Sequence, residues 1–401
     1  MVKLMLDGMG GDCRHRPPGS PHPLGIECYH VNARFSRGLE EVGAFKSGKL
    51  FLIFWFWLQV LWCRYRYGVE NFYYVPAPGK RVAVYRDWLV MLLCRIFFKR
   101  LILHWHAAGL SQWLEMETSG LARALNYRLF RPVDLSIVIS AFNRADGEKL
   151  ASHQIRVVPN GIPDPCPDFE TAVLPRRLAR LAVRTQWLGG QTPSASELAS
   201  AGEQPQVVKV LYLAHCMREK GLFDTLEAVA LANQQLVREQ SPLRLHLTVA
   251  GEFVRPEEKA EFEFRLTRPD IQCDYAGETK CCVTYVGFVG GERKRQVFVE
   301  SDLFCFPTYY SAESFGLVAV EAMAFGLPVV ATRWRSLKTM FPADYPGLVP
   351  PQAPQEVAAA LLRLLPVESG ERLRTHFLAH YTVEKFLSHL AAALHEAEAT
   401  R

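Results

Sequence analysis

Two glutamates, Glu313 and Glu321, stand eight residues apart and are the side chains in this chain best suited to chemistry. Eight residues of helix rise about 12 Å, because each residue adds about 1.5 Å. Two carboxylates at that separation cannot share one proton or one metal ion, but they can hold opposite ends of an extended ligand with phosphates between them. Spacing alone leaves an alternative open, an ordinary strand–helix–strand unit with one acid before its helix and one on it.

The residues around the two glutamates predict a strand, a loop, a helix and a second strand. Residues 303–307 are a short apolar run, 317–325 repeat apolar side chains at helical spacing, and 327–331 return to an apolar run. The loop 314–316 would bring a carboxylate and unpaired backbone N–H groups to a helix N-terminus, which attracts phosphate. A nucleotide-sugar fits, with the second glutamate near the ribose hydroxyls, the first near the sugar and the diphosphate over the loop.

The wording of residues 313–332, ESFGLVAVEAMAFGLPVVAT, resembles the E-x7-E signature of retaining GT-B glycosyltransferases, glycosyltransferase family 4 (glycosyl transferases group 1) in particular. The resemblance implies an α/β fold of the GT-B type, in which two Rossmann-like, doubly wound parallel-sheet domains face a cleft. It also implies a UDP- or GDP-sugar donor and transfer with retention of configuration. Glu313 would hold the sugar hydroxyls and Glu321 the ribose. The amides of the turn would complete the phosphate site: Ser314, Phe315, Gly316 and Leu317.

A lysine at a strand-to-helix turn is the next candidate. Lys220 can offset the charge that develops on a departing diphosphate. The resembled family has Gly-Arg, three variable residues and then Lys-Gly, whereas Ala214 and His215 stand here in place of Gly-Arg. A second cation would therefore come either from His215, if protonated, or from Arg218.

His106 ends an apolar strand, and active groups of open α/β sheets gather at the carboxyl ends of strands. It resembles the strand-end histidine of the family, which lies beside the sugar and acceptor. We expect it to position the sugar through a hydrogen bond and not to act as a general base, because the departing phosphate can take the acceptor's proton. His104 is expected on the other face of the strand, as a packing residue.

Glycines supply three further positions. Gly10 and Gly11 follow an expected first strand at 2–6 and resemble the family's glycine loop near the donor phosphates and acceptor, although a flexible surface loop is the alternative. Gly251 and Glu252 match the family's strand-end pair beside the nucleotide. No D-x-D and no His/Cys cluster with ligand spacing is present, so we expect neither a metal nor another cofactor.

Composition describes a folded protein of two ordinary domains. The chain has 401 residues, 49% hydrophobic and 22% charged. Its net charge of +5, from 46 Lys+Arg and 41 Asp+Glu, suits anionic donors or an acidic membrane surface and does not indicate nucleic acid. Ten cysteines without a C-x-x-C pair, and no signal-peptide pattern at the start, indicate reduced thiols in the cytoplasm.

Strand and helix patterns divide the chain into four parts. We expect an N-terminal, acceptor-side Rossmann-like domain at 1–165, a linker with an insertion at 166–206, and a C-terminal, donor-binding Rossmann-like domain at 207–380. The resemblance implies that a last helix, at 381–401, crosses back to the N-terminal domain. Expected strands lie at 71–75, 100–106, 135–140, 155–162, 207–213, 243–250 and 283–289.

The most apolar run, 50–63, has about 14 residues and is too short to span a bilayer, which takes about 20. Basic residues flank it at Lys46, Lys49, Arg64 and Arg66. A second amphipathic stretch follows at 86–100. Both stretches either pack in the core or lie on a membrane interface, so peripheral contact with the cytoplasmic face of a membrane is one hypothesis.

The sequence therefore predicts a glycosyltransferase that moves a hexose-type sugar from a nucleotide-sugar to a glycan or lipid-linked acceptor with retention. Two alternatives remain. One is a non-hydrolysing sugar-nucleotide epimerase on the same fold. The other is a non-catalytic nucleotide-sugar-binding protein, which the departure at His215 and the short N-terminus favour.

Overall fold

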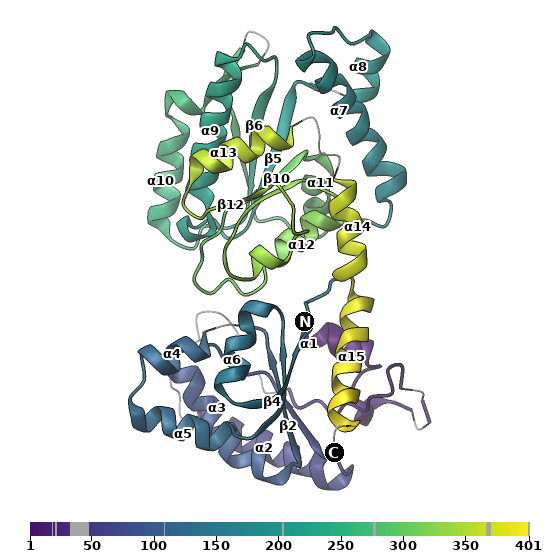
Figure 1. The fold of residues 1–401 in the computed structure, drawn as a ribbon, viewed down its shortest axis with the longest axis vertical. Coiled ribbons are helices and arrows are strands. Elements are labelled where there is room, and N and C mark those ends of the chain that lie inside the picture. Colours follow the sequence, from purple (N-terminus) through teal and green to yellow (C-terminus); the bar gives the residue numbers. More distant parts are fainter. Residues whose placement is uncertain are drawn as a thin grey trace. The chain divides into compact units, whose positions relative to one another are not determined.

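The computed structural model describes residues 1–17, 19–20, 22–32, 48–107, 109–202, 204–275, 278–365 and 370–399. The chain forms two compact units (Figure 1). The first consists of Met1–Gly161 with Val383–Arg401, and the second of Ile162–Thr382. The last helix, expected at 381–401, thus belongs to the first unit, and the stretch expected as a linker at 166–206 belongs to the second.

The first unit is built on a parallel four-stranded sheet in the order β1-β2-β3-β4. Its strands are β1 (Asn71–Tyr74), β2 (Arg100–Trp105), β3 (Val133–Val138) and β4 (Ser152–Val157). Its helices are α1 (Val2–Gly8), α2 (Gly48–Arg66), α3 (Arg81–Cys94), α4 (Leu110–Met116), α5 (Gly120–Phe130), α6 (Arg144–Lys149) and α15 (Val383–Ala399).

Both faces of this sheet are covered by a hydrophobic core, and successive side chains of a strand point to the two cores in turn. Leu101 and Leu103 of β2 pack in a core with α3, α4 and α5, whereas Ile102 points to a second core with α1 and α15. Figure 1 shows these two helical layers on opposite sides of the strands. Helices on both faces explain why the two central strands, β2 and β3, are buried almost throughout, as expected for a parallel sheet.

Residues 2–6 form a helix and not the expected first strand. Met5 and Met9, one helical turn apart, are both buried against the core that α15 provides. Gly8 lies so close to Leu387 of α15 that a Cβ would overlap the leucine side chain. Tertiary packing therefore decides the conformation of this short segment.

The second unit has a parallel six-stranded sheet in the order β12-β11-β10-β5-β6-β9, with a separate antiparallel pair β7-β8. Its strands are β5 (Val207–Leu213), β6 (Arg244–Ala250), β7 (Gln272–Tyr275), β8 (Glu278–Cys281), β9 (Val283–Gly287), β10 (Leu303–Phe306), β11 (Val329–Thr332) and β12 (Leu348–Val349). Its helices are α7 (Leu174–Leu188), α8 (Ala195–Ala201), α9 (Leu222–Arg238), α10 (Pro256–Leu266), α11 (Gly291–Glu300), α12 (Leu317–Ala324), α13 (Pro354–Leu364) and α14 (Glu371–His380).

Helix α7, in the stretch expected as a linker, is fixed to this sheet by a buried arginine. Arg184 is 2% exposed and donates from Nη2 to Asp302 Oδ2 at 2.8 Å and to the carbonyl of Val207 at 2.9 Å. Arg180 donates to the other oxygen of Asp302 at 2.9 Å. These bonds join the helix to the starts of β5 and β10.

The apolar run at 50–63 lies within α2, whose inner side packs on the core of the first unit. Trp57 donates from its indole N–H to the carbonyl of Leu93 in α3 at 2.8 Å. No helix within the described ranges combines the length and apolarity that crossing a bilayer requires. Lys46 and the side chain of Lys49, two of the flanking cations, lie outside the described residues.

Candidate functional site

The order of the strands in the second unit creates a topological switch point between β5 and β10. The chain runs from β5 to β6 on one side, and later places β10 against the other side of β5. Connections leave these two neighbouring strands in opposite directions, and ligands of open α/β sheets bind at such a switch point, outside the carboxyl ends of the strands. The loops 214–221 and 307–316 follow β5 and β10 and flank this position.

Lys220 and Glu313 meet at this switch point. Nζ of Lys220 donates to Oε2 of Glu313 at 2.6 Å, and both side chains are largely buried, 15% and 10% exposed. The ammonium also lies 4.7 Å from the centre of the Tyr310 ring. Two expected site residues, 93 positions apart, therefore form one charged pair.

A glycine allows the two loops to approach this closely. Gly221 has φ +82°, and a Cβ there would lie 2.5 Å from the carbonyl oxygen of Pro307. The backbone N–H of Tyr309 donates to the carbonyl of Glu219 at 2.8 Å. The loops are thus joined by backbone contacts on the lysine side as well as by the ion pair.

Helix α12 begins directly beside the pair. Gly316, with φ +70°, is its N-cap, and its N–H donates to Oε1 of Glu313 at 3.1 Å. One of the four expected phosphate-binding amides is therefore occupied by the glutamate. The N–H groups of Leu317 and Val318 belong to the first turn, where no intrahelical acceptor exists, and they remain suited to an anion.

Glu321 lies on the side of α12 that is not covered by the core. Its Oε1 accepts from Nζ of Lys294 in α11 at 2.7 Å, and its Oε2 is buried without a hydrogen-bond partner among the described residues. A buried carboxylate oxygen without a hydrogen-bond partner can accept from the hydroxyl groups of a ligand. Lys294 was not among the expected site residues, although it lies in the basic run Arg293-Lys294-Arg295.

The first acid is not part of the helix, because α12 begins only at Leu317. The separation of about 12 Å, which assumed eight helical residues, therefore does not describe the two carboxylates. Each glutamate instead has its own lysine, one from the loop after β5 and one from α11.

Gly251 and Glu252 lie beside the start of the lysine loop. Gly251 has φ +143°, and a Cβ there would overlap the carbonyl oxygen of Ala214. The N–H of Cys216 donates to the carbonyl of Glu252 at 2.8 Å. The side chains of Glu252 and His215 are exposed at this end of the sheet.

Arg218 is directed to α10. Its guanidinium forms an ion pair with Glu261 and lies 4.6 Å from the centre of the Phe223 ring. Its backbone N–H donates to Glu258 at 2.9 Å. A second cation for the diphosphate, from His215 or from Arg218, remains a prediction.

His106 follows β2 in the first unit. Burial lowers the pKa of His106 to about 4, and the ammonium of the chain's N-terminus adds to this, while the side chain of Asn160 acts in the opposite direction. The imidazole is therefore neutral at neutral pH. Such a ring can position a hydroxyl by a hydrogen bond, and it is not a source of positive charge.

His104 is buried and bonds Tyr73 through Nδ1, so it packs as expected. The expectation that it faces away from His106 is wrong. Residues two apart in a strand share a face, and the two rings lie 4.1 Å apart between centres.

Gly10 and Gly11 end α1 and do not follow a strand. Both have positive φ, +85° and +83°, and the N–H of Gly11 donates to the carbonyl of Leu6 at 2.7 Å. A left-handed residue with such a bond is a common helix terminus. A contact of these glycines with a ligand remains a prediction.

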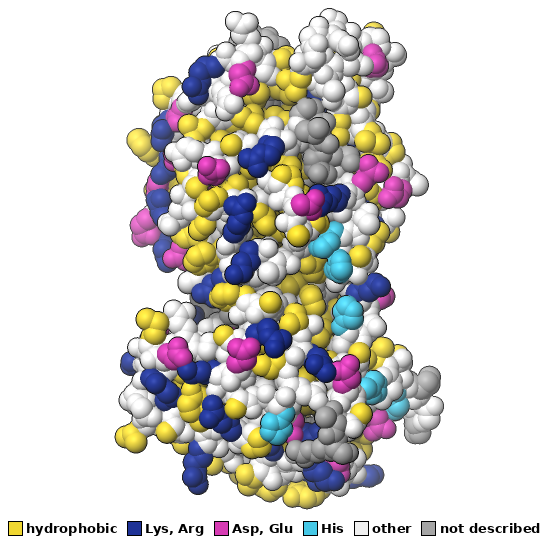
Figure 2. All heavy atoms as spheres, in the orientation of Figure 1, with side chains coloured by type: hydrophobic (Ala, Val, Ile, Leu, Met, Phe, Trp, Pro, Cys, Tyr) yellow, Lys and Arg dark blue, Asp and Glu magenta, His cyan; other side chains and the backbone are white. Residues whose placement is uncertain are grey.

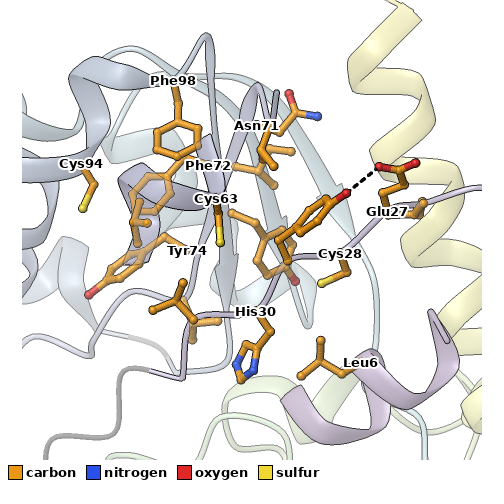
Figure 3. A pocket seen from close by; sticks show the side chains of 18 of the residues that line it. Leu6, Glu27, Cys28, His30, Cys63, Asn71, Phe72, Tyr74, Cys94 and Phe98 are labelled. Atoms are coloured by element: carbon orange, nitrogen blue, oxygen red, sulfur yellow. Dashed lines mark hydrogen bonds between the residues drawn. The ribbon is translucent and has the colours of Figure 1, made fainter. Parts of the chain in front are cut away.

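The first unit also contains a cavity of about 1110 Å³ (Figure 3). Its described lining is mostly apolar and comes mainly from α1, α2, β1, α3 and the stretch 25–32, with residues of β2 and α15. Phe72, Tyr74 and Phe98 border one side, and Leu6 and Cys28 lie across from them. Tyr73, which bonds His104, also lines the cavity, so the cavity adjoins the histidine pair.

Within the described ranges, no three His, Cys, Asp or Glu side chains gather in a way that would hold a metal ion. All ten cysteines of the chain are free thiols in the structure.

Most of the second unit matches a known protein family. Residues 207–366 match the model of the family Glycosyl transferases group 1. The match contains β5, Lys220, Glu313 and α12, and therefore both loops at the switch point. Among curated relatives, the D-inositol 3-phosphate glycosyltransferase of Pseudarthrobacter chlorophenolicus is 33% identical over 132 residues, 33% of this chain and 28% of the relative.

Solved structures resemble nearly the whole chain. The sucrose-phosphate synthase from Thermosynechococcus elongatus superposes with a TM-score of 0.56 at 20% identity, over 97% of this chain and 88% of that one. The Anabaena protein HepE, in complex with UDP and glucose, gives a TM-score of 0.55 at 17% identity, over 88% and 83%. The fold is GT-B.

The GT-B assignment confirms the expected fold class. The curated relatives support less of the chain, because the chain spans less than half the length of those that match it first. The catalytic activity of the GT-B chain, its donor and its acceptor are therefore matters for proposal.

Proposed function

We propose that this protein transfers a hexose-type sugar from a UDP- or GDP-sugar to a glycan or lipid-linked acceptor, with retention of configuration. The Lys220–Glu313 pair at the β5/β10 switch point, beside the N-terminus of α12, is the observation that carries the proposal. The family match over the same residues supports it. HepE, of the same fold, has been seen with UDP and glucose, which supports a uridine nucleotide as donor.

The reaction breaks the bond between sugar C1 and the diphosphate oxygen and forms a bond between C1 and the acceptor oxygen on the same face. The acceptor proton passes to the departing phosphate oxygen. Lys220 has three N–H groups and uses one on Glu313, so the others can donate to the diphosphate as negative charge develops there. Glu313 accepts from sugar hydroxyls, and Glu321 from the ribose.

The acceptor belongs to the first unit in this proposal. The neutral imidazole of His106 positions a hydroxyl, and the largely apolar cavity next to the histidine pair supports an acceptor with a hydrocarbon part. The free thiols support a reducing compartment, the cytoplasm, as the place of the reaction.

A panel of nucleotide-sugars tests the proposal. We expect one UDP- or GDP-sugar to raise the melting temperature, because a specific ligand stabilises by mass action. Consumption of that donor with an acceptor should then yield a glycoside with the donor's anomeric configuration, as measured by nuclear magnetic resonance. An isomerised donor formed without any acceptor would identify an epimerase, and binding without consumption a non-catalytic protein. Either result contradicts the proposal.

Glu321→Gln is expected to weaken UDP or GDP binding by about tenfold or more, since a charge-assisted hydrogen bond is worth about 1.5–3 kcal/mol. Lys294→Ala should weaken it less, because Lys294 donates to the Glu321 carboxylate and orients it, whereas the carboxylate itself accepts from the ribose hydroxyls. Calorimetric titration with the nucleoside diphosphate measures both. Lys259→Ala, an exposed lysine of α10, is the control and should change nothing. An unchanged Kd for Glu321→Gln would remove the ribose role.

A further inference from the structure

Helices α2 and α3 are apolar on the side turned away from the sheet as well as on the side that packs on it. Trp57 and Val60 of α2 and Val84 and Met91 of α3 contact one core over the sheet. Because both helices cover the same face of the sheet, their outer sides point away from it on the same side of the first unit (Figure 1).

The outer side of α2 carries one stripe of large apolar residues. Trp55, Leu58, Trp62 and Tyr65 recur at intervals of three and four, and each is exposed, the two tryptophans by 52% and 51%. A soluble helix normally places polar residues there, and a helix that is apolar all round is normally buried.

The outer side of α3 repeats the pattern. Val82, Tyr85 and Leu92, with Ile96 in the turn that follows the helix, are exposed at compatible spacing, Ile96 by 75%. Tyr65 of α2 and Phe97 next to Ile96 contact edge to face at 6.5 Å, which joins the two stripes at one end. We call these eight residues of the two stripes the α2–α3 outer face. A contiguous exposed apolar surface on a soluble protein commonly marks an interaction site.

The same segment is strongly basic. Residues 48–100 contain nine Lys or Arg and two Asp or Glu, a net charge of +7, whereas the whole chain carries +5. Both acids are engaged, since Asp87 is buried and accepts from Arg86, and Glu70 pairs with Lys99. Exposed cations include Arg66, Lys80 and Arg81. Figure 2 shows Lys and Arg side chains interspersed with apolar ones on the face of this unit that it draws.

We propose that the first unit docks on an anionic lipid bilayer through the α2–α3 outer face. Tryptophan and tyrosine rings are suited to the headgroup level, and the cations at its border to anionic lipids. Neither helix spans the bilayer, so both lie in the plane of its surface. A second copy of the chain is disfavoured as the occupant, because it would bring one segment of +7 against another.

Sedimentation with vesicles tests this docking. The full chain should sediment with vesicles of phosphatidylcholine containing phosphatidylglycerol, less with phosphatidylcholine alone, and less again at high salt. Trp62→Ser should lower partitioning by about tenfold, and Trp55→Ser with Trp62→Ser by about a hundredfold. Arg66→Glu with Arg81→Glu should weaken binding only to the anionic vesicles.

Phe264→Ser provides the matched control, because Phe264 is an equally large, exposed residue of α10 in the second unit, 69% exposed. It should sediment like the wild type. Ile96→Ser, on the other helix, repeats the test independently of the tryptophans, and circular dichroism confirms that each variant is folded. Absence of wild-type sedimentation, or equal loss in the control, overturns the docking. So does a dimer in sedimentation velocity that Trp62→Ser converts to monomer.

Vesicle binding is measured without nucleotide-sugar or acceptor. Its result is therefore independent of the proposed sugar transfer. A protein that binds vesicles but consumes no donor would refute only the reaction, and one that transfers sugar but ignores vesicles would refute only the docking.

Discussion

Replacing Glu313 by Gln is expected to lower kcat/KM for sugar transfer by about 10²- to 10³-fold, the usual effect of removing one preorganised group from a charge-stabilising site. Glutamine keeps the shape and can still accept from the Gly316 N–H, but it leaves the Lys220 ammonium without its counter-charge. Initial rates with the donor found by the thermal screen measure the effect. Lys220→Met should reduce the rate to a similar extent.

A double variant separates catalysis from stability. Each single change leaves a buried polar group without its partner, and should also lower the melting temperature. Lys220→Met with Glu313→Gln removes both charges, so stability should recover while activity stays lost. Glu292→Gln, an exposed acid of α11, is the control for charge removal alone. Near wild-type turnover in either single variant would show that the pair is structural only.

The second large expected effect is on the stability of the second unit. Asp302→Asn is expected to destabilise the second unit by about 3 kcal/mol, since breaking a buried charge pair from one side leaves an uncompensated charge. Arg184, 2% exposed, would lose its counter-charge, and α7 would lose its bond to the sheet. In a unit of this size the melting temperature should fall by roughly 10 °C, as measured by circular dichroism. Asp344→Asn, at an exposed pair with Arg372, should leave it unchanged.

Lowering the pH should remove the stabilisation that Asp302 gains from Arg184 and Arg180. Burial alone would raise the pKa of Asp302, but Arg184 and Arg180 lower it to about 2. The folded pKa is thus below the unfolded value of about 3.8, and the stabilisation is present above that value and lost as the pH falls toward 2. The difference in melting temperature between wild type and Asp302→Asn should therefore shrink over this range. A constant difference would contradict the charged state of Asp302.

Part of the second unit could be predicted because its central strands β5, β10 and β11 are buried on both faces. Such strands are continuous apolar runs, and residues 207–213 were expected and found as β5 without a shift. The last helix, 383–399, was likewise predictable from its amphipathic pattern. In both cases the local sequence is sufficient to predict the element.

Other parts depend on neighbours that the local sequence does not show. The first residues, VKLML, fit a strand or a helix, and the helix forms because Met5 and Met9 pack against α15 from the other end of the chain. Lys294 stands between two arginines, and only the packing of α11 against α12 selects it as the partner of Glu321. The stretch 166–206 was expected as a linker with an insertion. The burial of Arg177 and Arg184 in α7 could not be predicted, because arginine is rarely buried and the partners of these two residues lie far away in sequence.

The backbone contact between Gly221 and Pro307 has a consequence for chimaeric enzymes. Loops 214–221 and 307–316 touch at three places. Gly221 lies against the carbonyl oxygen of Pro307, the N–H of Tyr309 donates to the carbonyl of Glu219, and Lys220 pairs with Glu313. A loop transplanted alone from a homologue would meet an unmatched surface. The two segments therefore form one exchangeable module, and under the proposed function donor preference is best redesigned by exchanging both segments together.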